Sequence, residues 1–328
     1  MYSFILYFRH FGRFILLFIL ALVWLSCSEE IVRQYYKELP AANISLNQID
    51  SASLHFFVIS DWGFNGSSSQ KEVESEMNQI SKLVGLKFIL TCGDNFQYNG
   101  VKGINDPLWD SNFENVYNDS SLLVPWYPAL GNHDYDGDPD AEVEYSAKNK
   151  YWEMPGRYYT FVKRINSNIS VRFIVLDTQG LILEYKNITD TTKYDKITQY
   201  AWLTDLLSGV REEWIIVIGH HPVFSASHRH GDTEELKILI KPLFDKYSVD
   251  FYICGHDHNF EHAREKNKNT DYIVTGTGGS VRHESCNDKT VYSMSALGFT
   301  YISLFQDSAK LNFITSDGLI GYRYVRGK

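Results

Sequence analysis

The stretch KFILTCGDNFQYNG (87–100) decides how the rest of the chain is interpreted. An apolar run of strand character ends on Gly93 and Asp94, so a buried strand delivers a carboxylate at its carboxyl end. The same arrangement recurs in LHFFVIS (54–60), which is followed by Asp61, and in WIIVIG (214–219), which is followed by two histidines. Apolar strands without alternation, separated by helices, indicate sheets that are covered on at least one face.

The rest of the chain extends this alternation of strands and helices. We expect strands at 54–60, 87–92, 124–130, 171–178, 214–219 and 249–254, with helices at 67–85, near 108–118, at 199–210 and near 233–246. The tail from 272 to 325 reads as four successive β-strands, which suggests a second sheet packed on the first. The predicted fold is α/β, a single domain over 51–328 with a two-sheet central β-sandwich flanked by helices (the four-layer arrangement).

Composition limits the possible partners. The chain has 328 residues and a formal net charge of −9, so non-specific binding to nucleic acid or to an anionic membrane surface is not expected. We expect a monomer.

The first 27 residues read as a targeting segment. Arg9 and Arg13 precede and flank the apolar run FILLFILALVWL (14–25), and Ser26-Cys27 closes it. This ending resembles the lipobox of a bacterial lipoprotein, in which Cys27 would carry the lipid anchor; a cleaved secretory signal and an uncleaved anchor are the alternatives. Residues 28–50 read as a tether, and either way we expect an extracytoplasmic protein (periplasm, outer membrane or secreted).

The other cysteines do not form an obvious disulfide framework. With Cys27 lipidated, three remain, which cannot all pair within the chain. Cys92 and Cys254 both lie at predicted strand ends, so a disulfide between them is conceivable, but we favour buried free thiols.

Polar clusters follow five of the predicted strands: SDWG (60–63), CGDN (92–95), GNHD (131–134), GHHP (219–222) and CGHDHN (254–259). Loops at the carboxyl ends of strands in α/β sheets converge on a common crevice. We therefore expect one site that gathers Asp61, Asp94, Asn132, His133, His220, His256 and His258. Carboxylate, amide oxygen and imidazole groups are metal ligands, and they are too many here for one ion. Two metal ions that share a bridging carboxylate would use them all.

These clusters resemble the motifs of a known family. In this order, D-x-G, G-D, G-N-H-D, G-H-H and G-H-x-H are similar to those of the calcineurin-like metallophosphoesterases. The forms DWG, GDNF, GNHD, GHHPV and GHDHNF resemble the purple acid phosphatases of the small, tartrate-resistant kind (type 5). The resemblance covers roughly residues 54–325.

The resemblance implies a ligand set. Asp61, Asp94 and His258 would hold a first metal, which is ferric iron in the family. Asp94, Asn132, His220 and His256 would hold the second, which is ferrous iron, zinc or manganese, so that Asp94 bridges the two ions.

The resemblance also implies roles for other histidines. His133 matches the histidine that contacts the substrate phosphate and helps to protonate the leaving group. Either His230 or His228 is the counterpart of a further histidine of the animal enzymes. His221 lies beside a ligand and is expected at the rim of the site.

One position departs from the family pattern. In the family a tyrosine three residues after the bridging Asp binds ferric iron as phenolate, but here that residue is Gln97 and Tyr98 comes one later. A shift of one residue turns a side chain away, so Tyr98 is not expected to reach the metal and the metal identity is left open.

The expected function is hydrolysis of phosphate monoesters, of small molecules or phosphoproteins, by a metal-activated water. A phosphodiesterase or nucleotidase on the same centre is the alternative. A non-catalytic membrane-anchored scaffold, as in some parasite relatives, is a third, but it would be expected to have lost ligands.

Overall fold

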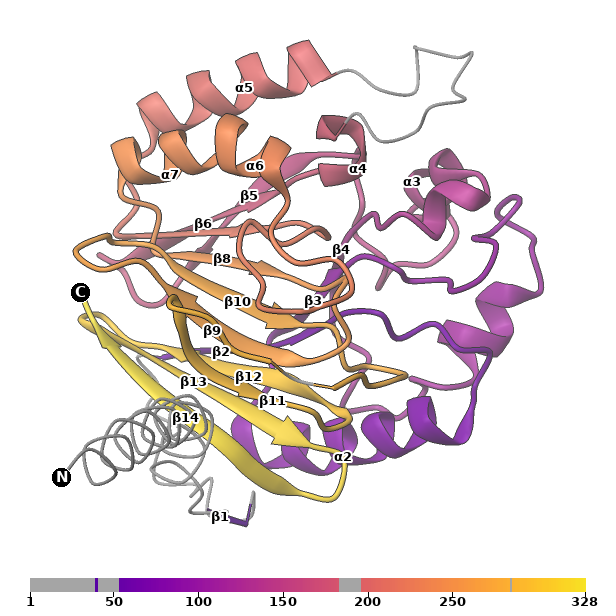
Figure 1. Ribbon diagram of the computed structural model, residues 1–328. Coiled ribbons are helices and arrows are strands. Elements are labelled where there is room, and N and C mark those ends of the chain that lie inside the picture. Colours follow the sequence, from indigo (N-terminus) through magenta and orange to yellow (C-terminus); the bar gives the residue numbers. More distant parts are fainter. Residues whose placement is uncertain (1–38, 41–52, 183–195, 284) are drawn as a thin grey trace, which may run out of the picture. The chain divides into compact units, whose positions relative to one another are not determined.

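The computed structural model describes residues 39–40, 53–182, 196–283 and 285–328, which belong to one compact unit spanning Glu38–Lys328 (Figure 1). Their strands form two sheets of seven. The first contains, in spatial order, β1 (Leu39–Pro40), β14 (Leu319–Gly327), β13 (Ser308–Thr315), β12 (Gly298–Leu304), β2 (Leu54–Ile59), β3 (Phe88–Cys92) and β4 (Trp126–Ala129). The second contains β11 (Thr290–Met294), β9 (Phe260–Arg264), β10 (Asp271–Thr275), β8 (Phe251–Cys254), β7 (Trp214–Ile218), β6 (Ser170–Val175) and β5 (Tyr159–Arg164).

Each sheet contains a run of parallel strands. Strands β2, β3 and β4 are parallel neighbours in the first sheet, and β6, β7, β8 and β10 are parallel neighbours in the second. Because parallel strands end at the same edge of a sheet, the loops that follow them are brought together there.

The two sheets pack face to face through aromatic side chains. The ring of Phe173 on β6 lies 5.4 Å from that of Phe56 on β2 and 5.3 Å from that of Phe88 on β3. Successive residues of a strand in the second sheet point to opposite faces of that sheet. On β7, Ile216 belongs to the core between the sheets, and Val217 belongs to the core between the second sheet and its helices. The strands are therefore apolar without alternation because both of their faces are covered.

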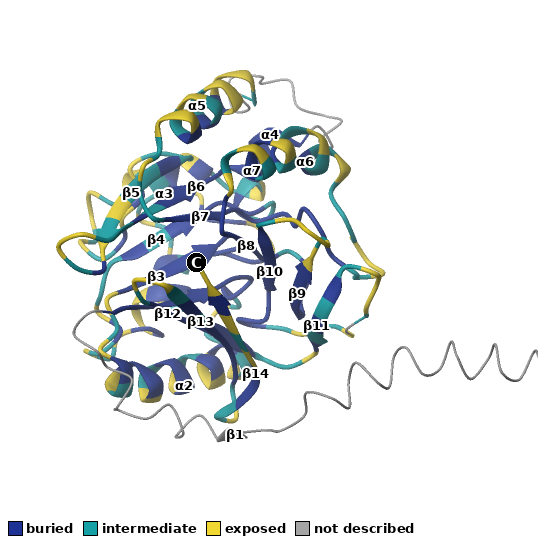
Figure 2. Ribbon diagram, turned by 90° about the vertical axis from the view of Figure 1, so that its left-hand side faces the viewer, coloured by how far each residue is buried: buried dark blue, intermediate teal, exposed yellow. Residues whose placement is uncertain are grey.

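Helices form the outer layers (Figure 1). Helices α4 (Thr178–Leu181), α5 (Lys196–Gly209), α6 (Glu234–Leu239) and α7 (Lys241–Tyr247) lie over the second sheet, and α2 (Ser68–Val84) lies against the first. Figure 2 shows the exposed residues on the outward faces of α2 and α5 and the buried residues in the strands. The predicted two-sheet sandwich with flanking helices is confirmed.

Helix α2 shows why the sequence specifies these elements. The side chain of Ser67 accepts a hydrogen bond from the backbone N–H of Gln70 at the start of the helix, and Gly85 ends it with a φ of 62°. Its buried face includes Val73, Met77 and Ile80, which recur at helical spacing.

The tail does not form a separate second sheet, and that expectation is wrong. Strand β10 joins the second sheet beside β8, whereas β12, β13 and β14 extend the first sheet. The reason is the burial of β12, whose seven residues are all buried. A strand covered in this way needs partners along both edges, and it finds them in β2 and β13.

Other elements differ from the sequence prediction in extent. The helix expected near 108–118 is a single π-helical stretch, η3 (Trp109–Glu114). The helix expected near 233–246 is broken into α6 and α7, because Pro242 in the first turn of α7 cannot continue the hydrogen bonding of α6. Helix α3 (Pro139–Tyr145) and the strands β5 and β9 were not predicted.

The predicted targeting segment 1–27 lies outside the described residues, and of the tether 28–50 only β1 is described. Among the described residues, no helix combines the length and apolar character needed to cross a membrane. Cys92 and Cys254 are buried free thiols, as predicted.

Candidate metal centre

The predicted donors lie on loops that leave the carboxyl ends of β2, β3, β4, β7 and β8. Backbone hydrogen bonds join these loops: Asp61 N donates to Gly93 O over 3.1 Å, and Gly255 N donates to His220 O over 3.0 Å. Donor atoms of Asp61, Asp94 and His220 lie within 4.8 Å of one another, and all three residues are buried. The structure therefore brings both sheets to one cluster of metal-binding groups.

Three of the site residues have a left-handed backbone. Asp61, Asp94 and His256 have φ values of 54°, 48° and 69°. Residues with a side chain rarely adopt this conformation, which costs free energy that the surrounding structure must supply. Strain of this kind concentrates at functional sites, and here it directs two carboxylates and one imidazole inward.

Glycines leave the space that the donors occupy. A Cβ on Gly93, whose φ is 86°, would lie 2.8 Å from His220 Nδ1, and a Cβ on Gly131 would lie 2.2 Å from Asp94 Oδ1. Both glycines stand beside a donor in sequence, in CGDN and GNHD. The chain ends its strands on Gly-Asp and Gly-Asn because any larger residue would collide with a neighbouring donor.

The ring of His220 shows that the cluster is arranged for a cation. Its Nδ1 lies 2.9 Å from the carbonyl oxygen of Cys92, which can only accept, so Nδ1 carries the proton. Burial lowers the pKa of His220 to about 4, so the ring is neutral and Nε2 presents a lone pair. That lone pair faces Oδ1 of Asn132 at 3.1 Å and Oδ1 of Asp94 at 3.3 Å. An imidazole nitrogen, an amide oxygen and a carboxylate oxygen that meet at one point are donors that fit a metal ion.

Asp61 and His258 form a second pair of this kind. Oδ1 of Asp61 is buried and has no hydrogen-bond partner, although Nε2 of His258 lies 3.3 Å away. The other ring nitrogen of His258 is hydrogen-bonded to the hydroxyl of Ser280. An orphaned carboxylate oxygen beside an imidazole that is oriented through its far nitrogen is the arrangement that a metal ligand pair needs.

Burial and charge in the cluster favour a bound cation. Burial, together with the charges of Asp61 and Asp134, raises the pKa of Asp94 well above its ordinary value. Burial and the neighbouring histidines lower the pKa values of His221 and His256 well below the ordinary value. The imidazoles are therefore neutral ligands, and a metal ion would relieve the repulsion between the two buried carboxylates.

Three histidines gather around His256. Its Nδ1 lies 3.2 Å from Nε2 of His220, and its ring centroid lies 4.6 Å from that of His221 and 4.1 Å from that of His230. His220, His221 and His256 form a second group whose donor atoms could hold a metal ion. His221 was expected only at the rim, and the doubled histidine of GHHP was the signal that could have included it among the donors.

The remaining candidates lie as follows. His133 donates its backbone N–H to Asp94 Oδ1 over 3.0 Å, and its ring lies 3.3 Å from a carboxylate oxygen of Asp136. His230 is exposed but its ring contacts that of His256, whereas His228 is exposed on the same loop. Of the two alternatives, His230 is therefore the one with a ring contact to a donor.

Gln97 and Tyr98 point in different directions. Nε2 of Gln97 donates a hydrogen bond to Asp94 Oδ2 over 3.1 Å, and Gln97 is buried. Tyr98 is 59% exposed, has a φ of 76°, and packs its ring against Phe64.

Asp134 supports the site but was not singled out as a candidate. Its carboxylate accepts backbone hydrogen bonds from Gly131 and Phe96, and burial raises its pKa to about 7. It therefore ties the loop after β3 to the loop after β4. The sequence signal for Asp134 is its place as the final residue of the GNHD cluster.

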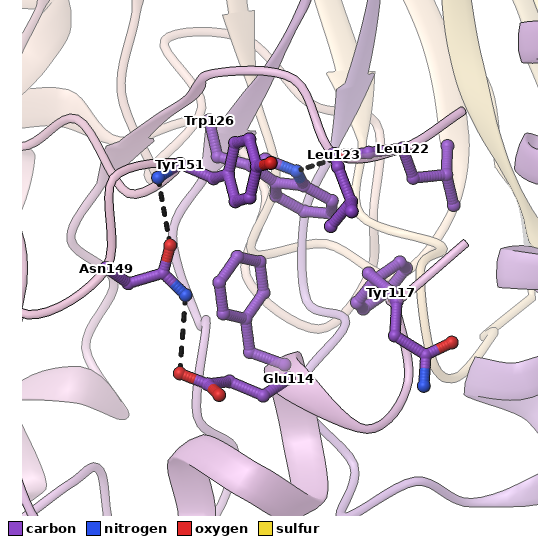
Figure 3. Close-up of a pocket in the computed structure, with 9 residues that line it drawn as sticks. Glu114, Tyr117, Leu122, Leu123, Trp126, Asn149 and Tyr151 are labelled. Atoms are coloured by element: carbon purple, nitrogen blue, oxygen red, sulfur yellow. Dashed lines mark hydrogen bonds between the residues drawn. The ribbon is translucent and has the colours of Figure 1, made fainter. Parts of the chain in front are cut away.

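A pocket of about 180 Å³ lies apart from these donors (Figure 3). Aromatic rings of η3 and β4 line it, with Glu114 and Asn149 joined by a hydrogen bond at its side. Two lining residues, Tyr117 and Trp126, also pack against Trp62 of the DWG motif. The pocket contains none of the predicted donors and belongs to the aromatic packing behind the first motif.

Fold and donors together define a phosphoesterase of the dinuclear-metal type. The family described as calcineurin-like phosphoesterase matches residues 54–260. Tartrate-resistant acid phosphatase type 5 of Oryctolagus cuniculus is 32% identical over 81% of this chain and 88% of its own length. Purple acid phosphatase 17 of Arabidopsis thaliana is 31% identical over 84% and 85%. The chain belongs to the calcineurin-like phosphoesterases, within the family of tartrate-resistant and purple acid phosphatases.

Solved structures agree with this assignment. GAP50, the anchor in the inner membrane complex of Plasmodium, has a TM-score of 0.76 and 27% identity, with 84% of this chain and 89% of that chain covered. The purple acid phosphatase PPD1 of yellow lupin has a TM-score of 0.63 at 18% identity, with 85% and 54% covered, and shares the fold.

Proposed function

We propose that this metal-dependent phosphatase hydrolyses phosphate monoesters at a dinuclear centre held by Asp61, Asp94, Asn132, His220, His256 and His258. The observation that carries the proposal is the convergence of Nε2 of His220 with the oxygens of Asn132 and Asp94 at 3.1 and 3.3 Å and with Nδ1 of His256 at 3.2 Å. Imidazole nitrogens, an amide oxygen and a carboxylate oxygen that meet in this way are the donor set of a metal ion.

The ligands divide into two sets. Asp61, Asp94 and His258 are assigned to the first ion, and Asp94, Asn132, His220 and His256 to the second, so Asp94 is the bridge. When bound, the two ions supply an activated water and neutralise charge on the phosphoryl group. His133 stands beside Asp94 and is assigned to the substrate, to which its ring can donate a hydrogen bond and a proton. His230 is assigned to the same mouth of the site because its ring contacts that of His256.

The identity of the ions is a separate proposal. Gln97, a neutral amide, occupies the place where the family has an anionic tyrosinate. With one anionic ligand fewer, the first site favours ferric iron less strongly and accepts ferrous iron, manganese or zinc. Iron in the first site, and iron, zinc or manganese in the second, remain the assignments implied by the family.

A non-catalytic role is the second candidate, because GAP50 is described as an anchor and covers most of this chain. A scaffold has no need of metal ligands. Here six of the seven family ligand positions are retained, the exception being Gln97. The enzymatic role is therefore the better supported.

The test combines metal analysis with hydrolysis. Purified full-length protein should contain two metal ions per chain by elemental analysis and should hydrolyse phenyl phosphate. Faster hydrolysis of bis(4-nitrophenyl) phosphate than of phenyl phosphate would favour the phosphodiesterase alternative. Bound metal without hydrolysis of either ester would favour the scaffold.

The location of the protein follows from the leader. We propose that Cys27 is lipidated and anchors a monomeric enzyme outside the cytoplasm, where phosphorylated small molecules or phosphoproteins are its substrates. The support is the apolar run 14–25 ending in Ser-Cys.

A further inference from the structure

Two arginines lie on loops beside the metal centre. Arg229 lies in the loop 223–233 after β7, and Arg282 lies in the loop 276–289 after β10. Among the described residues, no ion pair joins either guanidinium to a carboxylate, although Arg157, Arg172, Arg264 and Arg326 all form such pairs. An arginine is charged at any working pH, so both carry a positive charge that is not paired with a carboxylate of the described residues.

The side chain of Arg229 is oriented by a hydrogen bond to the next residue, His230. Its Nε donates a hydrogen bond of 3.0 Å to Nε2 of His230, whose ring centroid lies 4.1 Å from that of His256. The ring of His230 therefore lies between the guanidinium of Arg229 and His256, a proposed ligand of the second metal ion.

The position of Arg282 is fixed by a backbone hydrogen bond to His258, a proposed ligand of the first metal ion. Its N–H donates to the carbonyl oxygen of His258 over 2.7 Å, and its own carbonyl accepts from Ser295 Oγ over 2.6 Å. Its Nη1 is buried and has no hydrogen-bond partner. An unsatisfied buried N–H of a charged group costs free energy unless a ligand accepts from it.

The charges of the two arginines act on each other. Burial and the charge of Arg229 lower the pKa of Arg282, while Asp61 and Asp257 oppose that shift. A bound metal ion would neutralise the charge of Asp61, which would then no longer offset the charge of Arg282. Two like charges in this position are unfavourable until an anion binds between them.

The loops that carry the arginines are fixed in place. Ser225 Oγ donates to Asp257 over 2.6 Å, and Ala226 N donates to Glu261 over 2.9 Å. The hydroxyl of Ser285 donates to the carbonyl oxygen of Ala226 and so ties one loop to the other. These hydrogen bonds tie the segments that carry the two arginines to each other and to β9, which lowers the cost of binding an anion.

We infer that Arg229 and Arg282 bind a second phosphate of the substrate, next to the phosphate that is hydrolysed at the metal centre. The preferred substrates are then compounds with two phosphates, in which one is cleaved as a monoester or anhydride and the other stays on the leaving group. Water supplies the oxygen for the phosphate that is released, and the leaving group takes the proton. This inference rests on the proposed phosphatase function and specifies its substrate class.

The test compares substrates with one and two phosphates. The value of kcat/KM is measured for phenyl phosphate, 1,4-phenylene bisphosphate and pyrophosphate, two bisphosphates of different spacing. For Arg229→Gln and Arg282→Gln we expect kcat/KM to fall about tenfold or more for at least one bisphosphate, and much less for phenyl phosphate. Arg282→Lys keeps the charge but loses the paired N–H donors of the guanidinium, so its kcat/KM for that substrate should lie between those of wild type and Arg282→Gln.

Arg211→Gln is the matched control. Arg211 is exposed, its side chain donates only to the backbone carbonyls of Ser208 and Val210, and the substitution removes the same charge away from the site. It should leave all three substrates unaffected. Metal content and melting temperature of each variant show whether the site is intact.

Equal losses of kcat/KM on all three substrates would assign the arginines to the cleaved phosphate and overturn the inference. An unchanged kcat/KM for every substrate would also overturn it. Binding of pyrophosphate to the metal-loaded protein, measured by calorimetry, does not depend on turnover. Wild type that binds two metals and pyrophosphate but hydrolyses nothing would refute the proposed function alone. Binding of pyrophosphate that is equal in wild type and Arg282→Gln would refute the second-phosphate site alone.

Discussion

The amide of Gln97 donates a hydrogen bond of 3.1 Å to Oδ2 of Asp94, while its neighbour Tyr98 is 59% exposed. The residue three positions after the proposed bridging carboxylate is therefore a neutral amide that contacts the carboxylate, and the tyrosine hydroxyl is directed elsewhere. The left-handed backbone of Tyr98, with a φ of 76°, separates the directions of the two side chains.

The first prediction is that the ferric protein lacks the intense visible band that a tyrosinate ligand gives. With Tyr98 packed on Phe64, no phenolate is available for charge transfer to iron. The measurement is a visible spectrum of protein in which elemental analysis and electron spin resonance show ferric iron at the dinuclear site. Wild type and Tyr98→Phe should have the same spectrum; an intense band that disappears in Tyr98→Phe would contradict the assignment.

Asp94 should be the most costly single ligand to replace, because it is assigned to both ions. In Asp94→Asn we expect loss of at least one of the two metal ions and a fall in kcat of at least about 10³-fold, the order of magnitude of removing a major electrostatic contribution to catalysis. Asp110→Asn, a change of the same kind at an exposed position on η3, is the control. Two bound ions and ordinary turnover in Asp94→Asn would refute the shared ligand.

His133 should affect turnover and spare the metals. Its backbone, not its ring, contacts Asp94, so His133→Ala keeps that hydrogen bond and removes only the imidazole. We expect kcat to fall by about 10²-fold, the lower range for a general acid, with two ions still bound. His228→Ala, which alters an exposed histidine of another loop, should change kcat less than His230→Ala. Departure of both ions from His133→Ala would make His133 a ligand.

The strands and their polar ends could be predicted because both depend on local sequence. An apolar run such as FILTC favours a buried strand, and the Gly-Asp that follows it in sequence is thereby located at the carboxyl end of that strand. The division of the tail between two sheets could not be predicted, because the pairing of β12 with β2 joins segments that are distant along the chain. The hydrogen bond of Gln97 and the approach of His221 to His256 depend likewise on loop conformations that only the folded chain defines.

Lipidation of Cys27 is predicted from the leader alone. Radiolabelled fatty acid should enter the wild-type protein in cells and should fail to enter Cys27→Ser. Cys286→Ser, which changes an exposed cysteine far along the chain, is the control and should be labelled like wild type. Equal labelling of wild type and Cys27→Ser, or a mature N-terminus at another residue, would refute the lipoprotein hypothesis.

The last prediction concerns the pH dependence of stability through Glu76 on α2. Burial and the charge of Asp317 raise the pKa of this carboxyl to about 7, whereas glutamate in an unfolded chain titrates near pH 4.3. The folded protein therefore holds a proton on Glu76 that the unfolded chain releases between these values. This contribution to the free energy of unfolding is complete below about pH 4 and is lost as the pH rises through 7.

Replacing Glu76 with glutamine removes this titration while keeping an amide that can bond to Gln79, the residue that now donates to Glu76 over 3.1 Å. Compared with wild type, Glu76→Gln should gain about 1 kcal/mol in the free energy of unfolding at pH 8, and the gain should shrink as the pH falls to 5. Urea unfolding of both proteins at pH 5, 6.5 and 8 measures the difference, and Glu72→Gln, at an exposed position of the same helix, is the control. Any effect of pH on the metal centre is common to both proteins, so the difference between them isolates Glu76. A difference that does not vary with pH, or that grows toward pH 5, would show that Glu76 is ionised in the folded protein throughout this range.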